Sequence, residues 1–384
     1  MTQFINGPTN FAHLKGTING IVKNIYLFMD NHYPLNEQTR CESFDSIDVS
    51  QYLYKLIKNT TESLDFFTEI KQHDINLPPT NKRDIYIKEI NEMFKSEFIL
   101  EKIDDKNIVK YSKTNSNVRL HYLDIRDHLD LFYIIDIIKF DIPETFDLIF
   151  KNIGDRKENL NKILEYINNI EFLLNKFNKN IREIVIVPKE KYNKIDKQKY
   201  YFNKIINKYE NNELKENINN FIDIHVGHLM YNLTRYIDEL KPYIENYDEK
   251  YNNKIKESNQ HIYDSSIDIY SLMTDVYLLR RILDKDYITN CIVYSGAQHS
   301  VNYMYFLIKY CNFELITIYR SIEKDKNTLV KLIKETQYAF DIYKFIYLKE
   351  KKYLQCLKFH VPYFRKYRTD LFEYPDFDKL YSSK

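Results

Sequence analysis

The sequence predicts an α/β fold in which a mainly parallel sheet is flanked by helices and carries a large helical insertion. Three observations support this: short β-branched and aromatic runs end at polar or turn residues, amphipathic helical patterns separate them, and one long stretch is helical throughout. Strands that alternate with helices of this length usually pair in parallel. We therefore expect an α/β core of residues 1–125 and 287–384, and a largely helical insertion of residues 126–286.

The predicted strands are rich in β-branched and aromatic residues, and each ends at a polar residue or a turn. Four of them are residues 24–30, 64–69, 118–124 and 290–295. Two further strands are predicted at residues 183–187 and 313–319.

The predicted helices carry apolar residues three or four positions apart, which places those side chains on one face. They cover residues 46–58, 84–98, 158–177, 214–240 and 263–283. A further apolar helical pattern follows Gly296.

The composition is that of a globular protein without a dominant charge. Apolar residues make up 44% of the 384 residues, which is enough for a substantial core, and 56 basic side chains are matched by 55 acidic ones. Because almost no net charge results, binding to nucleic acid is not indicated. The most apolar region, residues 131–150, is interrupted by charged residues and Pro143, so we expect no membrane span.

The cysteines give no sign of a disulfide framework or a cysteine-rich zinc site. None of the four forms a C-x-x-C pair. We therefore expect a protein of a reducing compartment, the cytoplasm.

Polar side chains gather where the predicted strands end. In a parallel sheet the carboxyl ends of the strands share one edge, so these residues are expected to converge. The early strands contribute Asp30, His32 and Glu69, the third contributes Asp124, Arg126 and Asp127, and the late strand is followed by Gly296 and His299.

This set of side chains predicts either metal binding or acid–base chemistry. Asp30, His32, Glu69 and His299 are suited to a divalent ion such as Mn, Fe, Co or Zn, which would activate water. Without a metal, one of the two histidines would act as a general base oriented by a carboxylate, and Arg126 would stabilise developing negative charge. The alternative for Arg126 is an ion pair with Asp124 or Asp127.

The segment around His299 is the most informative. Gly296 is one of six glycines, and a strand-to-helix turn favours a residue without Cβ. His299 would then lie near a helix N-terminus, where the dipole favours the neutral ring, and would face outward as a usable base. The alternative is an ordinary connection whose histidine only caps the helix. Five further residues are predicted to hold the site residues in place: Asp124, Asp127, Asp275, Tyr277 and Arg281.

The order and spacing of five short blocks resemble a known group of proteins. The blocks are residues 27–32, 65–69, 122–126, 275–281 and 292–299, and the first and last end in histidines. This pattern is similar to the erythromycin-esterase, ChaN and TIKI/TraB group, and more closely to uncharacterised proteins of giant DNA viruses. The resemblance implies that Asp30, His32, Glu69 and His299 form the active or metal-binding site.

The resemblance implies a fold and a site but no single reaction, because members of the group open lactone esters, act as metalloproteases or bind haem iron. It also implies a viral protein of the infected host cytoplasm or the virion. Met29 stands where the group favours glycine and Asp30 where it favours glutamate, so the first loop is expected to be less open.

Two functions of different classes follow. The first is a metal-assisted hydrolase acting on an ester or amide in a small molecule or peptide. The alternative is a catalytically inert viral protein that binds a host or viral protein partner.

Other signals are weaker. His225 and His228 lie three residues apart on a predicted helix but lack an evident third zinc ligand, and residues 363–368 form an aromatic and basic tail. No G-x-S-x-G, P-loop or G-x-G-x-x-G motif is present.

Overall fold

The computed structural model describes residues 2–31, 39–71, 85–103, 106–124, 141–151, 153–179, 205–347 and 355–360. The chain forms two compact units, one of residues 1–125 and 281–384 and the other of residues 126–280. The predicted strand at residues 183–187 and the tail at 363–368 lie outside the described residues.

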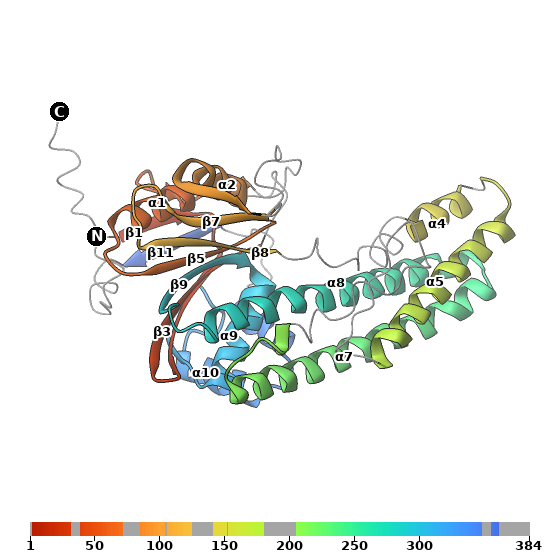
Figure 1. Cartoon of the computed structure of the whole chain (residues 1–384). Coiled ribbons are helices and arrows are strands. Elements are labelled where there is room, and N and C mark those ends of the chain that lie inside the picture. Colours follow the sequence, from red (N-terminus) through yellow and green to blue (C-terminus); the bar gives the residue numbers. More distant parts are fainter. Residues whose placement is uncertain are drawn as a thin grey trace. The chain divides into compact units, whose positions relative to one another are not determined.

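A six-stranded mixed sheet forms the α/β unit, as predicted for the fold class (Figure 1). The spatial order is β10-β2-β3-β9-β5-β8, and the pairs β3–β9, β9–β5 and β5–β8 are parallel. The strands are β2 (Asn10–Ile18), β3 (Ile21–Asp30), β5 (Leu64–Lys71), β8 (Val118–Asp124), β9 (Asn290–Gly296) and β10 (Glu314–Tyr319).

In the described residues, five further strands, none of them predicted, form two small sheets. In one, β1 (Thr2–Asn6) lies between β4 (Ile47–Asp48) and β11 (Cys356–His360). In the other, β6 (Phe98–Ile103) pairs with β7 (Lys106–Ser112). Strands β4 and β11 have only two and five residues, which leaves little periodicity in the sequence to reveal them.

The antiparallel hairpin β2–β3 was also missed, although the sequence carries its signal. Asn19 and Gly20 join the two strands with φ of 53° and 78°. Asn-Gly is the preferred pair for a two-residue hairpin turn, because both positions need positive φ. Asn10–Ile18 would have been recognised as a strand had this turn been weighed.

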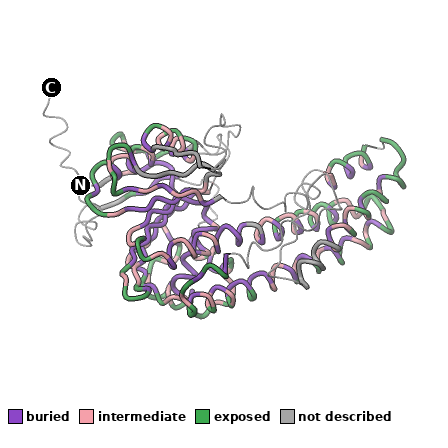
Figure 2. The backbone as a smooth tube through the Cα atoms, in the orientation of Figure 1, coloured by how far each residue is buried: buried purple, intermediate pink, exposed green. Residues whose placement is uncertain are grey.

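Helices cover both faces of the six-stranded sheet (Figure 1). One face packs on α1 (Val49–Asn59) and α2 (Ile85–Glu97) through a core that includes Phe28, Leu53, Phe66 and Phe94. On the other face, α9 (Ala297–Cys311) contacts β2, β3 and β9, and is followed by α10 (Lys326–Glu335) and α11 (Ala339–Ile346). Figure 2 shows the resulting burial along the central strands.

In its described residues, the second unit consists of helices joined by turns and contains no strand. It contains α4 (Ile142–Phe150), α5 (Arg156–Lys179), α7 (Asn212–Glu245), the 3-10 turn η4 (Glu249–Tyr251) and most of α8 (Asn252–Leu283). Helix α5 packs against α4 and α7, and Tyr236 of α7 stacks on His261 of α8 at 4.6 Å between ring centroids. Within the described ranges, no helix is both long and apolar enough to cross a membrane.

Two cysteines are joined, contrary to the expectation from their spacing. Cys41 and Cys356, 315 residues apart, form a disulfide. Asn6 of β1 explains the pairing: its side chain accepts a hydrogen bond from the Cys41 amide at 2.7 Å, and its backbone lies opposite Cys356. Spacing along the chain could not reveal two segments that meet only on a third.

Removing this disulfide is expected to destabilise the α/β unit. The Cys41→Ser/Cys356→Ser variant should lose about 2–4 kcal/mol of unfolding free energy, because a cross-link over so long a loop restricts the unfolded chain. Urea denaturation measures this loss, and Cys311→Ser, which removes a half-buried thiol that is not part of a disulfide, is the control. Equal midpoints for the double variant and the control would contradict the pairing.

A buried histidine in the centre of β2 is held in its neutral form. Burial lowers the pKa of His13 from its ordinary 6.5 to about 4, although a hydrogen bond with Asn24 acts in the opposite direction. The ring also stacks on Tyr26. As the pH falls, His13 is therefore protonated near pH 6.5 in the unfolded chain but only near pH 4 in the folded chain.

This difference makes stability depend on pH. The contribution of neutral His13 is fully present above pH 6.5 and is lost as the pH falls to about 4, by about 3 kcal/mol at 1.36 kcal/mol per pKa unit. His13→Gln, which can still donate to Asn24, should lose correspondingly less stability over this range. Urea denaturation at pH 7, 5.5 and 4 tests this against the half-exposed control His261→Gln. Parallel pH profiles for the two variants would rule the effect out.

Candidate functional site

Three predicted site residues meet at the carboxyl edge of the parallel strands. Strand β9 lies between β3 and β5, and Asp30 at the end of β3 is paired with Gly296 at the end of β9. Glu69, near the end of β5, reaches Gly296 from the other side. The convergence expected from strand order is thus seen for Asp30, Glu69 and Gly296.

Glu69 and His299 form a buried acid–imidazole pair. Glu69 Oε1 lies 3.2 Å from His299 Nε2, and Glu69 Oε2 accepts a hydrogen bond from the Gly296 amide at 2.7 Å. Both side chains are less than 10% exposed. His299 lies in the first turn of α9, as predicted, but it is buried against Glu69 rather than facing outward. One carboxylate therefore orients the ring and accepts an amide where the helix begins.

The conformation of Gly296 does not depend on its being glycine. Its φ of −52° and ψ of 148° are accessible to any L-residue. The backbone conformation of this turn therefore does not explain why a glycine stands there. What the turn contributes is the amide N–H that Glu69 binds.

Asp30 accepts hydrogen bonds from two side chains. One donor lies on the neighbouring strand β9, and the other is the residue just before β11. Its Oδ2 accepts from the Tyr294 hydroxyl at 2.9 Å, and its Oδ1 accepts from Gln355 Nε2 at 3.1 Å. Asp30 is 2% exposed, and Tyr294 and Gln355 are fully buried. Hydrogen bonds to both oxygens compensate the burial of the carboxylate.

Met29 lies within the sheet, one residue before the end of β3. It is fully buried in β3 and pairs with Ser295, and its carbonyl oxygen accepts hydrogen bonds from the amide and hydroxyl of Thr9. The strand continues through Met29 to Asp30, and the loop that the sequence predicts to be less open lies largely outside the described residues.

The predicted metal ligands are engaged with one another or with neighbouring donors. Each oxygen of Asp30 and Glu69 already has a hydrogen-bonding or ionic partner, and His299 Nε2 faces Glu69 rather than an open position. In the part of the chain that is described, no three or more His, Cys, Asp or Glu side chains group as a metal site would. The three described ligands of the predicted metal site are thus engaged in hydrogen bonds or ion pairs, and the fourth, His32, lies outside the described residues.

The remaining predicted residues are placed only in part. Arg126 and Asp127 fall outside the described residues, and only the backbone of Asp124 is described, at the end of β8. Asp275, which is fully buried, and Tyr277 lie on α8 in the helical unit. Arg281 belongs to the α/β unit, where it contacts His121 on β8. His225 and His228 hydrogen-bond within α7, to Phe221 and Asn232.

Sequence reasoning missed Tyr294 and Gln355. The alternation of β9 could have indicated Tyr294, since side chains at positions two apart in a strand share a face. No local signal identifies Gln355, which lies 325 residues from Asp30 along the chain.

Comparison with known proteins relates the chain to a viral family. Residues 3–265 and 253–363 match the family described as "Family of unknown function (DUF5847)". "Uncharacterized protein R161" of Acanthamoeba polyphaga mimivirus is 30% identical over 83% of this chain and 88% of its own length. "Uncharacterized protein R706" of the same virus is 29% identical over 82% and 86%. No solved structure matches the chain. The predicted similarity to giant-virus proteins is confirmed.

Removing the Tyr294 hydroxyl should lower stability, because Asp30 would stay buried with one hydrogen-bond donor fewer. Tyr294→Phe is expected to lower the unfolding free energy by about 1–3 kcal/mol, because a buried carboxylate loses a donor. Urea denaturation measures the change, with Tyr231→Phe on the exposed surface of α7 as the control that leaves stability unchanged. A Tyr294→Phe protein as stable as the control would show that this hydrogen bond contributes nothing.

Proposed function

We propose that this chain, which belongs to the family of unknown function DUF5847, is a hydrolase that cleaves an ester or amide by acid–base chemistry at Glu69 and His299. The observation that carries the proposal is the buried Glu69–His299 pair at the carboxyl edge of the sheet. The substrate class is a small molecule or peptide with a hydrolysable carbonyl.

The position of the pair within the sheet supports a ligand site. Strands β3 and β5 are separated by β9, so the chain leaves β3 through α1 on one face and leaves β9 through α9 on the other. At such a reversal of strand order the adjacent connections diverge, and open α/β sheets bind ligands there. Glu69 and His299 flank this position on β5 and α9.

The chemistry follows from the orientation of the imidazole. With Nε2 directed at Glu69, the Nδ1 of His299 is the nitrogen that would take a proton from an attacking water. Glu69 would hold the ring and stabilise the imidazolium formed as the water oxygen adds to the carbonyl carbon. His299 would then return the proton to the leaving oxygen or nitrogen. Arg126 retains its proposed role of stabilising the negative charge on the tetrahedral intermediate.

A metal-assisted form of the same site is the second version of this proposal. Mn, Fe, Co or Zn would bind Asp30, His32, Glu69 and His299, and would supply Lewis-acid activation of water. Metal binding would require Asp30 to lose its hydrogen bonds with Tyr294 and Gln355. Glu69 would have to lose its contacts with the Gly296 amide and His299.

Two finer features of the proposal rest on the sequence pattern. The similarity of the two histidine-ending blocks to the erythromycin-esterase, ChaN and TIKI/TraB group favours ester or amide hydrolysis over other acid–base reactions. We also propose that residues 126–286 are a helical insertion in the α/β core. The compact helical unit of residues 126–280 is consistent with this arrangement.

The proposal is tested by hydrolysis assays on a panel of esters, lactones and peptides. His299→Ala and Glu69→Gln should each lower kcat/KM by about 10²–10⁴-fold, as expected for loss of a general base or of the group that orients it. His261→Ala, which removes a half-exposed histidine of the helical unit, is the matched control and should keep full activity. Circular dichroism verifies that each variant is folded.

Metal dependence separates the two versions of the site. Activity that survives chelation and correlates with no bound metal supports the acid–base version, whereas restoration by one of the four metals supports the other. If the folded protein hydrolyses nothing on the panel with or without metals, or if the site variants match His261→Ala, the hydrolase proposal fails. The inert viral protein that binds a host or viral partner would then be the preferred function.

A further inference from the structure

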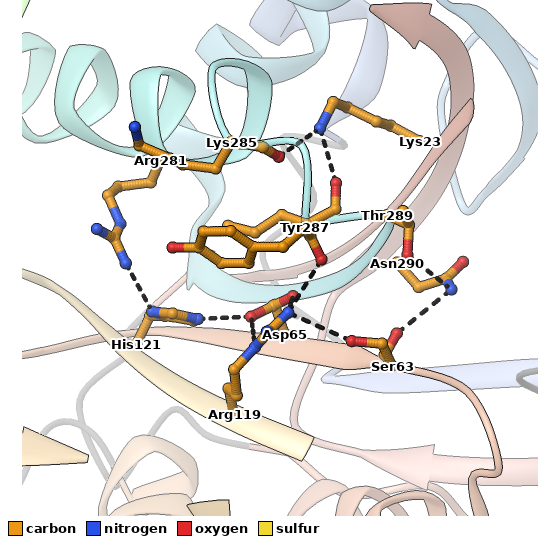
Figure 3. A network of polar contacts seen from close by, with 11 residues as sticks. Lys23, Ser63, Asp65, Arg119, His121, Arg281, Lys285, Tyr287, Thr289 and Asn290 are labelled. Carbon is orange, nitrogen blue, oxygen red and sulfur yellow. Dashed lines mark hydrogen bonds and ion pairs between the residues drawn. The ribbon is translucent and has the colours of Figure 1, made fainter. Parts of the chain in front are cut away.

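A second polar cluster lies on the sheet, formed by Asp65, Arg119, His121 and Arg281. Figure 3 shows Arg281 extending from α8 toward His121 of β8, with Asp65 of β5 and Arg119 of β8 beyond the ring. The proposed function uses none of these four residues. All four residues belong to the α/β unit.

The hydrogen bonds fix which nitrogen of His121 carries the proton. His121 Nε2 lies 2.7 Å from Asp65 Oδ1, and Arg281 Nη2 lies 3.2 Å from His121 Nδ1. Because a guanidinium only donates, Nδ1 must accept, and Nε2–H donates to the carboxylate. The ring is therefore neutral here, and it stacks on Phe67 at 4.5 Å between ring centroids.

Asp65 is already compensated by Arg119. The guanidinium donates two hydrogen bonds to the carboxylate, at 2.7 and 2.6 Å, and also donates to the Tyr287 carbonyl. Burial raises the pKa of Asp65, but the hydrogen bonds from His121 and Arg119 together hold it below its usual range. Asp65 and Arg119 thus neutralise each other.

Arg281 carries a positive charge that no carboxylate of the cluster balances. Its contact with His121 is to a neutral ring, and in the described ranges no carboxylate forms an ion pair with it. The other nearby cation, Lys23 of β3, donates to the carbonyls of Lys285 and Ile288 (Figure 3). A half-buried guanidinium directed at a neutral acceptor leaves a positive charge that an anion would compensate.

We propose that Arg281 and His121 bind a phosphate-type dianion. An oxygen of the ligand would replace Nδ1 as the acceptor of the Arg281 hydrogen bond, and His121, protonated on Nδ1, would donate to a second oxygen. The site is open to a ligand in part, since the side chains of His121 and Arg119 are 15% and 24% exposed.

The charge balance favours a dianion over a carboxylate. With His121 protonated, the cluster carries three positive charges and one negative, so two negative charges neutralise it. A carboxylate supplies one, whereas a phosphate group supplies about 1.5 to 2 near neutral pH. Asp65 makes the protonation accessible, because it stays hydrogen-bonded to Nε2–H throughout.

The groups that face His121 determine how binding depends on pH. Burial lowers the pKa of His121, Asp65 raises it, and Arg281 and Arg119 lower it. Lys23 and the buried thiol of Cys291 lie near Asp65, and Lys23 also interacts with the carboxylates of Asp284 and Asp286. Free His121 is therefore neutral at pH 7, and binding takes up a proton, so affinity should rise as the pH falls.

Isothermal titration of the full chain with inorganic phosphate, sulfate and acetate tests the proposal. Sulfate keeps its double charge from pH 5.5 to 8, so its affinity reports protonation of the protein alone. Sulfate should bind at least about tenfold more tightly at pH 5.5 than at pH 8. Phosphate should bind at pH 7.5, where most of it is doubly charged, and acetate should bind at least about tenfold more weakly.

Variants assign the binding to the two residues. Arg281→Gln should weaken both dianions at least about tenfold, while Arg235→Gln, which removes the same charge from an exposed position on α7, should not. His121→Gln can still donate to Asp65 but cannot be protonated, so it should abolish the pH dependence of sulfate binding. Arg281→Lys keeps the charge without the fork and serves if Arg281→Gln does not fold.

Three results would each overturn the inference. The first is the absence of phosphate and sulfate binding at ligand concentrations up to about 10 mM. The second is equal affinity of the Arg281→Gln and Arg235→Gln variants for the dianions. The third is acetate binding as tight as that of the dianions. None depends on hydrolytic activity, so the outcome is independent of the function proposed for Glu69 and His299.

Discussion

The parallel pairing of β9 between β3 and β5 is the constraint on which the rest of the site depends. It places Gly296 beside Asp30 in the ladder and within 2.7 Å of Glu69. Because the next residues form the first turn of α9, the same pairing delivers His299 to the Glu69 carboxylate. A shift of β9 by one residue would exchange the faces of all its side chains and separate these groups.

Two of the buried carboxylates lie on β5, and both have partners. Asp65 and Glu69 lie on the same strand, separated by the buried ring of Phe67. Asp65 is neutralised by Arg119 near one end of the strand, while Glu69 pairs with His299 and a backbone amide near the other. An unpartnered buried carboxylate would cost several kcal/mol, so these contacts are needed for the fold as well as for any chemistry.

Segments from the two ends of the chain meet beside the same edge of the sheet. Strand β1 pairs with β4 on one side and β11 on the other, and the disulfide between Cys41 and Cys356 links their neighbourhoods. Gln355, the residue before Cys356, donates to Asp30. The support of Asp30 is therefore tied to a covalent cross-link, which makes the geometry around this carboxylate sensitive to the state of two cysteines that sequence reasoning took to be unpaired.

The sequence by itself determined the α/β class, the parallel strands β3, β5, β8 and β9 and the strand ends at which Asp30, Glu69 and His299 lie, because hydrophobic periodicity records which face of each segment is buried. The Asn19–Gly20 turn also carried a local signal, which was overlooked. Only the tertiary structure decided that Glu69 meets His299, that Gln355 supports Asp30 and that Arg281 meets His121. Those partners are chosen by packing between distant segments, and local spacing does not encode that choice.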